Sequence, residues 1–209
     1  MLEINLSDAG KKYQYEWIFK NLNLQVNDQA KIAITGSNGS GKSTFLKCLS
    51  GQIPLTEGKL SYVFNQKPIQ ESGYYKLLAI SAPYLELPEE YTLKELLDFH
   101  FKFKNTASGV DLAEIPKIMY LEKSINKQIL YFSSGMKQRL KLGLCLFSDV
   151  PLLLLDEPAS NLDKKGIAWY QELIHTHGSQ KTIFICSNDP REYAFCEQVL
   201  HIEDFKLIS

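Results

Sequence analysis

The chain has 209 residues, of which 44% are hydrophobic and 22% charged. This composition is typical of a folded globular protein and excludes a largely disordered chain. With 23 basic and 24 acidic residues the formal net charge is −1, so we expect no dominant electrostatic attraction to nucleic acid or acidic lipid. No apolar run reaches the roughly 18 residues that a membrane-spanning helix needs, and the N-terminus lacks a signal-peptide pattern. These features predict a cytosolic protein whose four cysteines are reduced and packed.

The first part of the chain reads as strands followed by one helix. Alternating apolar and polar residues predict short strands at 2–6 and 22–26. The apolar run at 30–35 predicts a buried strand. A helical pattern follows at 42–50, and Gly51 stands where the helix is expected to end.

The rest of the chain alternates between strand and helix patterns. Residues 57–82 have a strand-like texture, and residues 91–130 have a helical one. The remaining predicted elements are a helix after Ser133, a buried strand at 151–155 that ends in an acidic pair, a helix at 164–175, and buried strands at 182–186 and 199–202. This alternation predicts an α/β fold around a mainly parallel sheet.

A glycine-rich loop lies between the predicted buried strand and the first helix, and it fits the pattern G-x-x-x-x-G-K-[ST]. Its glycines let the backbone turn so that N–H groups point at phosphate oxygens, and the helix adds its positive end. In such a loop Lys42 faces the β- and γ-phosphates of a nucleotide, and the Ser43 hydroxyl binds Mg²⁺. The predicted phosphate-binding residues are Gly36, Ser37, Asn38, Gly39, Ser40, Gly41, Lys42, Ser43 and Thr44.

An acidic pair, Asp156 and Glu157, follows four consecutive leucines. A buried strand of this kind delivers its last residues to the carboxyl edge of the sheet, close to the phosphate loop. We expect Asp156 to hold Mg²⁺ and Glu157 to polarise an attacking water. The alternative, a solvated acidic turn, is weak because the strand fixes where the pair points.

These two motifs, taken with two more, resemble those of the ATP-binding-cassette (ABC) ATPases, the nucleotide-binding subunits of ABC transporters. Residues 132–136 resemble the signature sequence of that family, and Ser160 to Asp163 resembles the D-loop that follows its catalytic glutamate. The signature candidates are Phe132, Ser133, Ser134, Gly135 and Met136. An ordinary helix cap is the alternative reading of this segment.

The resemblance covers nearly the whole chain and carries several implications. The fold would be a P-loop NTPase core (1–82 and 136–209) that includes an N-terminal antiparallel β part, with an inserted helical subdomain at 83–135. The ligands would be ATP and Mg²⁺. The partners would be a second ABC ATPase subunit, facing this one across two ATP molecules, and a transmembrane subunit at the inner face of the cell membrane. No direct nucleic-acid partner is expected.

An aromatic residue ahead of the core strands stacks on adenine in this family. Tyr13 occupies the matching position, and Tyr15 and Trp17 are close rivals. Packing into the antiparallel β part is an equally good reading of Tyr13.

Two switch positions depart from the family pattern, and Met136 in place of the signature glutamine is a milder change. Pro83 stands where the family has a glutamine that reaches toward Mg²⁺, and Asn188, which is counted among the catalytic candidates with Lys42 and Glu157, replaces a histidine. An amide can donate a hydrogen bond to a γ-phosphate but cannot become a charged donor, so we expect slower hydrolysis with binding retained. For Tyr84, contact with the nucleotide or a partner and simple packing both stay open.

The predicted function is the ATPase subunit of an ABC transporter, in which a groove formed by residues 83–105 receives a short helix of the membrane partner. Two alternatives stay open. One is a soluble ABC protein that acts on nucleic acid or ribosomes, and the other is a regulatory switch that binds ATP but hydrolyses it slowly.

Overall fold

The computed structural model describes residues 1–206, and its strands form two sheets. The antiparallel sheet has the strand order β2 (Glu16–Val26), β1 (Leu2–Tyr13), β4 (Glu57–Phe64) and β5 (Lys67–Ile69). The other sheet is parallel throughout and has the order β6 (Leu78–Ser81), β7 (Leu152–Asp156), β8 (Thr182–Cys186), β3 (Lys31–Thr35) and β9 (Gln198–His201). The predicted α/β fold is therefore confirmed.

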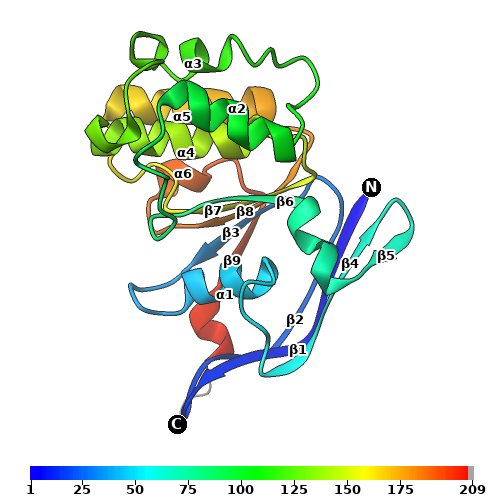
Figure 1. Ribbon diagram of the computed structural model, residues 1–209. Coiled ribbons are helices and arrows are strands. Elements are labelled where there is room, and N and C mark those ends of the chain that lie inside the picture. The colour runs from blue at the N-terminus through cyan, green and yellow to red at the C-terminus, as the bar shows by residue number, and fades with distance from the viewer. Residues whose placement is uncertain (207–209) are drawn as a thin grey trace.

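The parallel sheet is covered on both faces (Figure 1). On one face lie α4 (Ser134–Leu146) and α5 (Lys164–His177), and on the other lies α1 (Lys42–Leu49), between the parallel and antiparallel sheets. Alternate residues of one strand serve the two cores: Leu153 and Leu155 pack toward α4 and α5, whereas Leu152 and Leu154 pack toward α1. Because β7 is buried on both faces, its sequence is a continuous apolar run.

The expected antiparallel part is present but more extensive than the alternation at 2–6 indicated. β1 continues to Tyr13 through register irregularities after Leu6, and Asp8 adopts φ 47° at one of them. Bulges of this kind break the period-two pattern while the pairing continues, which is why alternation alone ended the strand early.

The segment at 91–130 is less helical than its sequence pattern indicated. It contains α2 (Leu93–Phe103), the one-turn helix α3 (Ile115–Ile118) and the 3-10 turns Glu122–Ser124 and Ile129–Tyr131. A capping box, in which Thr92 and Glu95 bond each other's backbone N–H groups, starts α2. Figure 1 places this green segment on the α4–α5 side of the parallel sheet.

The prediction of a buried strand at 199–202 is wrong in its burial. β9 pairs only with β3, at the edge of the sheet, and Val199 is 50% exposed. Its apolar residues resemble those of a core strand, but position in the sheet decides burial. Three short elements remain: the 3-10 turn Glu71–Lys76, which lies between β5 and β6, and α6 (Pro190–Tyr193) and the 3-10 turn Ile202–Phe205, which flank β9.

The four cysteines are free thiols; Cys48, Cys145 and Cys186 are buried and Cys196 is half-buried, in line with the expectation. Within residues 1–206, none of the helices combines the length and the apolar character needed to cross a membrane.

Candidate functional site

The carboxyl ends of β3, β7 and β8 meet at one edge of the parallel sheet. Register fixes this meeting, because Asp156 of β7 pairs with Cys186 of β8, which in turn pairs with Ile34 of β3. The glycine-rich loop leaves this edge after Thr35 and enters α1 at Lys42. The predicted nucleotide motifs therefore leave the sheet at the same edge.

The backbone of the loop needs glycine at several points. Gly36, Gly39 and Gly41 have φ values of 144°, 79° and 109°, which residues with a Cβ rarely adopt. Gly41 has a second constraint, since a Cβ there would lie 2.1 Å from Cγ2 of Ile18 on β2. The first N–H groups of α1 have no acceptor within the helix, so they are available to an anion.

Lys42 is buried, and its ammonium group donates to the carbonyl oxygens of Gly36 (2.7 Å) and Ser37 (3.1 Å). The cation is thus held against the loop that would surround phosphate.

Asp156 is 3% exposed, and its Oδ2 has no hydrogen-bond partner among the described residues. Burial raises the pKa of this carboxyl group, and the Ser43 hydroxyl and the Lys42 and Lys47 ammonium groups partly oppose the rise. A buried carboxylate with a free oxygen beside a serine hydroxyl supplies the hard oxygen ligands that Mg²⁺ prefers. These two residues therefore fit a magnesium ion.

A buried carboxylate with no metal ion bound to it raises the free energy of the folded state. Replacing Asp156 with Asn is therefore expected to stabilise the nucleotide-free protein by about 1 kcal/mol. A raised pKa in the folded state means that the ionised form destabilises the fold. The gain should thus be absent where both states are protonated and should grow as pH rises through the carboxyl range. Thermal unfolding across pH without nucleotide measures this, with exposed Asp98→Asn as control. An equal or lower melting temperature for Asp156→Asn at neutral pH would contradict the argument.

Glu157 and Asn188 project at the same edge. Glu157 is exposed and adopts φ 45°, and its N–H donates to the carbonyl of Cys186 (2.9 Å). The side chain of Asn188 donates to Oδ1 of Asn38 in the glycine-rich loop (3.2 Å). The structure thereby brings three of the motifs predicted from sequence within contact of one another.

The segment that resembles the signature starts α4. Ser133 is the N-cap, and its hydroxyl accepts from the N–H of Met136 (3.3 Å), while Ser134 is exposed and Phe132 is buried in the core. A Cβ on Gly135 would lie 3.2 Å from the carbonyl of Asn161. This segment therefore lies against the D-loop candidate of the same chain.

The D-loop candidate is held by α4 and starts α5. Gln138 donates to the carbonyl of Pro158 (2.7 Å), and Asp163 caps α5 by accepting from Gly166 (2.7 Å). The Ser160 hydroxyl has no hydrogen-bond partner among the described residues. Asp163 therefore has a structural role as the N-cap of α5.

The three aromatic residues that are candidates for stacking on adenine differ in how exposed their rings are. Tyr13 is 47% exposed and Tyr15 is 94% exposed, at the turn between β1 and β2. The Trp17 ring instead packs against Gly10 and lies under the ammonium groups of Lys12 and Lys20. The Tyr13 ring also lies under an ammonium group, that of Lys11 at 5.1 Å, so Tyr15 has the freest ring of the three.

The chain at Pro83 and Tyr84 borders the same site. Lys141 of α4 donates to the carbonyls of Ala82 (3.2 Å) and Pro83 (3.3 Å). The Tyr84 ring lies 4.1 Å from Nζ of Lys47, and burial together with the charge of Asp156 raises the pKa of its phenol. Lys47 is four residues after Ser43 on α1, so one helix face serves both. Sequence reasoning left the place of Tyr84 open and missed Lys47, which no motif singles out.

Residues 201–203 contact the start of the glycine-rich loop. The sequence patterns did not predict this contact. His201 bonds the Thr35 hydroxyl (2.6 Å), and Ile202 is buried 3.0 Å from where a Cβ on Gly36 would be. Glu203 accepts from the hydroxyl and N–H of Ser37, which lowers the pKa of that carboxyl group. No local pattern connects residues this far apart in the sequence.

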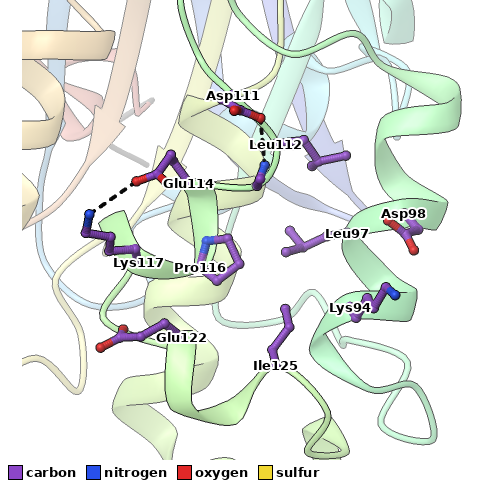
Figure 2. Close-up of a pocket in the computed structure, with 11 residues that line it drawn as sticks. Lys94, Leu97, Asp98, Asp111, Leu112, Glu114, Pro116, Lys117, Glu122 and Ile125 are labelled. Carbon is purple, nitrogen blue, oxygen red and sulfur yellow. Dashed lines mark hydrogen bonds and ion pairs between the residues drawn. The ribbon is translucent and has the colours of Figure 1, made fainter.

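A cavity of about 630 Å³ lies elsewhere, between α2 and residues 111–125 (Figure 2). Leu97, Leu112 and Ile125 point into it, and charged side chains such as Asp98 and Lys94 line its rim. None of its lining residues belongs to the predicted nucleotide motifs. It is therefore separate from the site at the sheet edge.

A glycine-rich loop between a parallel strand and a helix, with an acidic pair at a nearby strand end, defines a P-loop nucleotide-binding protein. A family model described as "ABC transporter" matches residues 19–160. The lantibiotic transport ATP-binding protein SrtF of Streptococcus pyogenes is 30% identical over 206 residues, covering 97% of this chain and 84% of SrtF. The chain therefore belongs to the ABC transporter family.

Other comparisons agree over the whole length. The ABC transporter ATP-binding protein YybJ of Bacillus subtilis is 26% identical over 206 residues, covering 98% of this chain and 94% of YybJ. The solved dimer of the ATP-binding cassette MJ0796 bound to ADP and Pi has a TM-score of 0.81 at 21% identity, covering 99% of this chain and 97% of that one. At 21% identity, the similarity to the MJ0796 cassette shows the fold alone.

Proposed function

We propose that this chain is the ATP-binding and ATP-hydrolysing subunit of an ABC transporter, and that it drives transport through a separate transmembrane partner. The observation that carries the proposal is the convergence of Lys42, Asp156, Glu157 and Asn188 at one sheet edge. The similarity to SrtF, named for lantibiotic transport, supports the transport role.

In the proposed reaction a water attacks the γ-phosphorus in line with the departing ADP oxygen. Glu157 orients this water and accepts its proton, while Lys42 and the loop N–H groups stabilise charge on the phosphate oxygens. Asn188, already bonded to the loop through Asn38, would turn its amide N–H to the γ-phosphate. Ser43 and Asp156 would hold Mg²⁺, whose positive charge would stabilise the negative charge on the phosphate oxygens.

A complete site would need a second subunit. One chain carries one phosphate loop and one signature, and in the proposed dimer the Ser133–Met136 segment closes over ATP bound by the opposing loop. The free N–H groups at the start of α4 suit an anion there. ATP would hold the dimer closed, and hydrolysis would release it.

The membrane partner would bind a groove of about 400 Å³ along the free edge of β6. Its walls combine apolar Leu85, Leu87 and Leu144 with the polar side chains of His100 and Lys141. The groove adjoins Pro83, whose carbonyl is bonded by Lys141. A helix docked here would therefore press on the chain next to the nucleotide site, which suits transmission of movement.

The test is affinity purification of the tagged full chain from detergent-solubilised membranes of its own cell, followed by mass spectrometry and an ATPase assay of the complex. A polytopic membrane protein in stoichiometric yield, with ATP hydrolysis in the complex, is expected. Recovery of only soluble partners such as ribosomal or DNA-bound proteins would contradict the transport role and favour the soluble alternative.

Substituting His for Asn188 is expected to raise turnover by about threefold, because an imidazolium donates a charge-assisted hydrogen bond that an amide cannot. The gain should fade as pH rises above about 6.5, where an imidazole loses its proton. Steady-state ATPase rates of the parent and of Asn188→His from pH 6 to 8.5 measure this. Asn188→Ala is the control and should be slower than the parent. If Asn188→His is no faster than Asn188→Ala, position 188 does not contact the γ-phosphate.

A further inference from the structure

A buried carboxylate lies just outside the residues used in the proposed reaction. Glu192 on α6 is 4% exposed, and its Oε1 accepts the N–H of Ala159 at 2.8 Å. Burial raises the pKa of this carboxyl group, the hydrogen bond from Ala159 opposes the rise, and Oε2 has no hydrogen-bond partner among the described residues. No ion pair within residues 1–206 includes it. Burying a carboxylate without a positively charged partner destabilises the fold, which indicates that this side chain performs a role.

Glu192 connects the two loops that carry the reacting side chains. Ala159 is two residues after Glu157, and the Glu192 N–H donates to the carbonyl of Asp189, which directly follows Asn188 (3.0 Å). The helix that holds the carboxylate is itself fixed, because the Tyr170 hydroxyl of α5 donates to the carbonyl of Glu192 at 2.9 Å. One residue therefore bonds the loop after β7 and borders the loop after β8.

The loop after β7 needs such a tether. Glu157 has φ 45°, a conformation that costs energy for a residue with a Cβ. The turn is held on one side by the bond from the Glu157 N–H to Cys186, and inside by the bond from the Ser160 N–H to the Glu157 carbonyl. Two side chains also hold this turn: Gln138 through its bond to the carbonyl of Pro158, and Glu192 through its bond from the N–H of Ala159. Without the bond from Ala159 to Glu192, the part of the turn after Pro158 loses its tether, and Glu157 can relax toward an ordinary φ and shift its carboxylate.

We propose that Glu192 is a positioning residue that keeps Glu157 and Asn188 in a fixed relation, so that both address the same γ-phosphate. The inference rests on the proposed ATPase function. It assigns Glu192 no contact with the nucleotide. Its loss should therefore slow hydrolysis without weakening ATP binding.

The kinetic test compares Glu192→Ala and Glu192→Gln with the parent. Glu192→Ala is expected to lower kcat about tenfold, with the affinity for a fluorescent ATP analogue within about twofold of the parent. Glu192→Gln keeps an oxygen that can accept from Ala159 and should restore kcat to within about threefold. Exposed Glu172→Ala on α5 is the matched control and should behave as the parent. If Glu192→Ala hydrolyses ATP at the parental rate, or loses binding and turnover together, the inference is overturned.

A second measurement does not depend on turnover. Hydrogen exchange of the full chain, read by mass spectrometry without nucleotide, should be faster in Glu192→Ala for peptides covering both 157–163 and 187–189. Faster exchange confined to α6, or spread through the whole protein, would overturn the inference. Parental turnover unaffected by Glu157→Gln would count against the proposed function instead, so the two failures are distinguishable.

Discussion

Replacing Glu157 with Gln is expected to lower ATP turnover at least about 100-fold, the scale on which a positioned general base acts. Gln has the same shape, so the exposed side chain at the end of β7 keeps its place but cannot take a proton from water. Binding should be retained because Lys42 and the glycine-rich loop are untouched. Single-turnover phosphate release and the affinity for a fluorescent ATP analogue together measure the two effects.

The control for this substitution is Glu172→Gln, which changes an exposed carboxylate far along α5 in the same way. The expected arrest should also prolong the life of an ATP-bound dimer, which size-exclusion chromatography with ATP and Mg²⁺ detects. Equal turnover in the parent and in Glu157→Gln would contradict the assignment of Glu157 as base. It would leave the slow regulatory switch as the better description of this chain.

The order of elements around the phosphate loop could be predicted because local patterns determine it. Leu152 to Leu155 form an unbroken apolar run, which only a strand covered on both faces accommodates in a sheet. The glycines at 36, 39 and 41 occupy backbone conformations that few other residues adopt. Composition and conformation are tightly linked at such positions, so the sequence alone indicated the loop, the strand and the acidic pair that follows it.

What the sequence did not disclose depends on contacts between distant residues. The bond from Ala159 to Glu192 spans 33 residues and that from Ser37 to Glu203 spans 166. Neither glutamate belongs to a periodic pattern or a motif, so each reads as surface charge until the fold places it.

Position within a sheet is a second source of error. Val199 and Leu200 have the β-branched and apolar character of a core strand, yet β9 pairs on one side only and stays largely exposed. Contacts with other segments also explain why the expected helix is interrupted between α2 and α3, where residues 104–114 form turns and irregular chain. There Ala107 donates to the carbonyl of Phe147, and Thr106 bridges to Ser148. Periodicity describes what a segment prefers, and these contacts override it.

The glycine-rich loop and the antiparallel sheet should depend on each other through Gly41. Gly41→Ala is expected to destabilise the fold by about 3 kcal/mol, the sum of a strained φ of 109° and an overlap with Ile18, to which a Cβ would approach within 2.1 Å. Nucleotide binding should be lost as the loop shifts to relieve the overlap. Urea unfolding and titration with a fluorescent ATP analogue measure both effects.

Two controls separate the causes of this loss. Gly109→Ala imposes a similar strain, at φ 78°, but its Cβ meets nothing within 4 Å, so it should cost only about 1 kcal/mol and leave binding intact. Adding Ile18→Ala to Gly41→Ala removes the overlapping Cγ2 methyl group, so the double variant should be more stable than the two single losses predict. Strict additivity would mean that the contact between the loop and β2 does not limit the substitution, and that strain alone explains the glycine. A coupling of about 1 kcal/mol or more would mean that β2 helps to set the shape of the phosphate-binding loop before any nucleotide arrives.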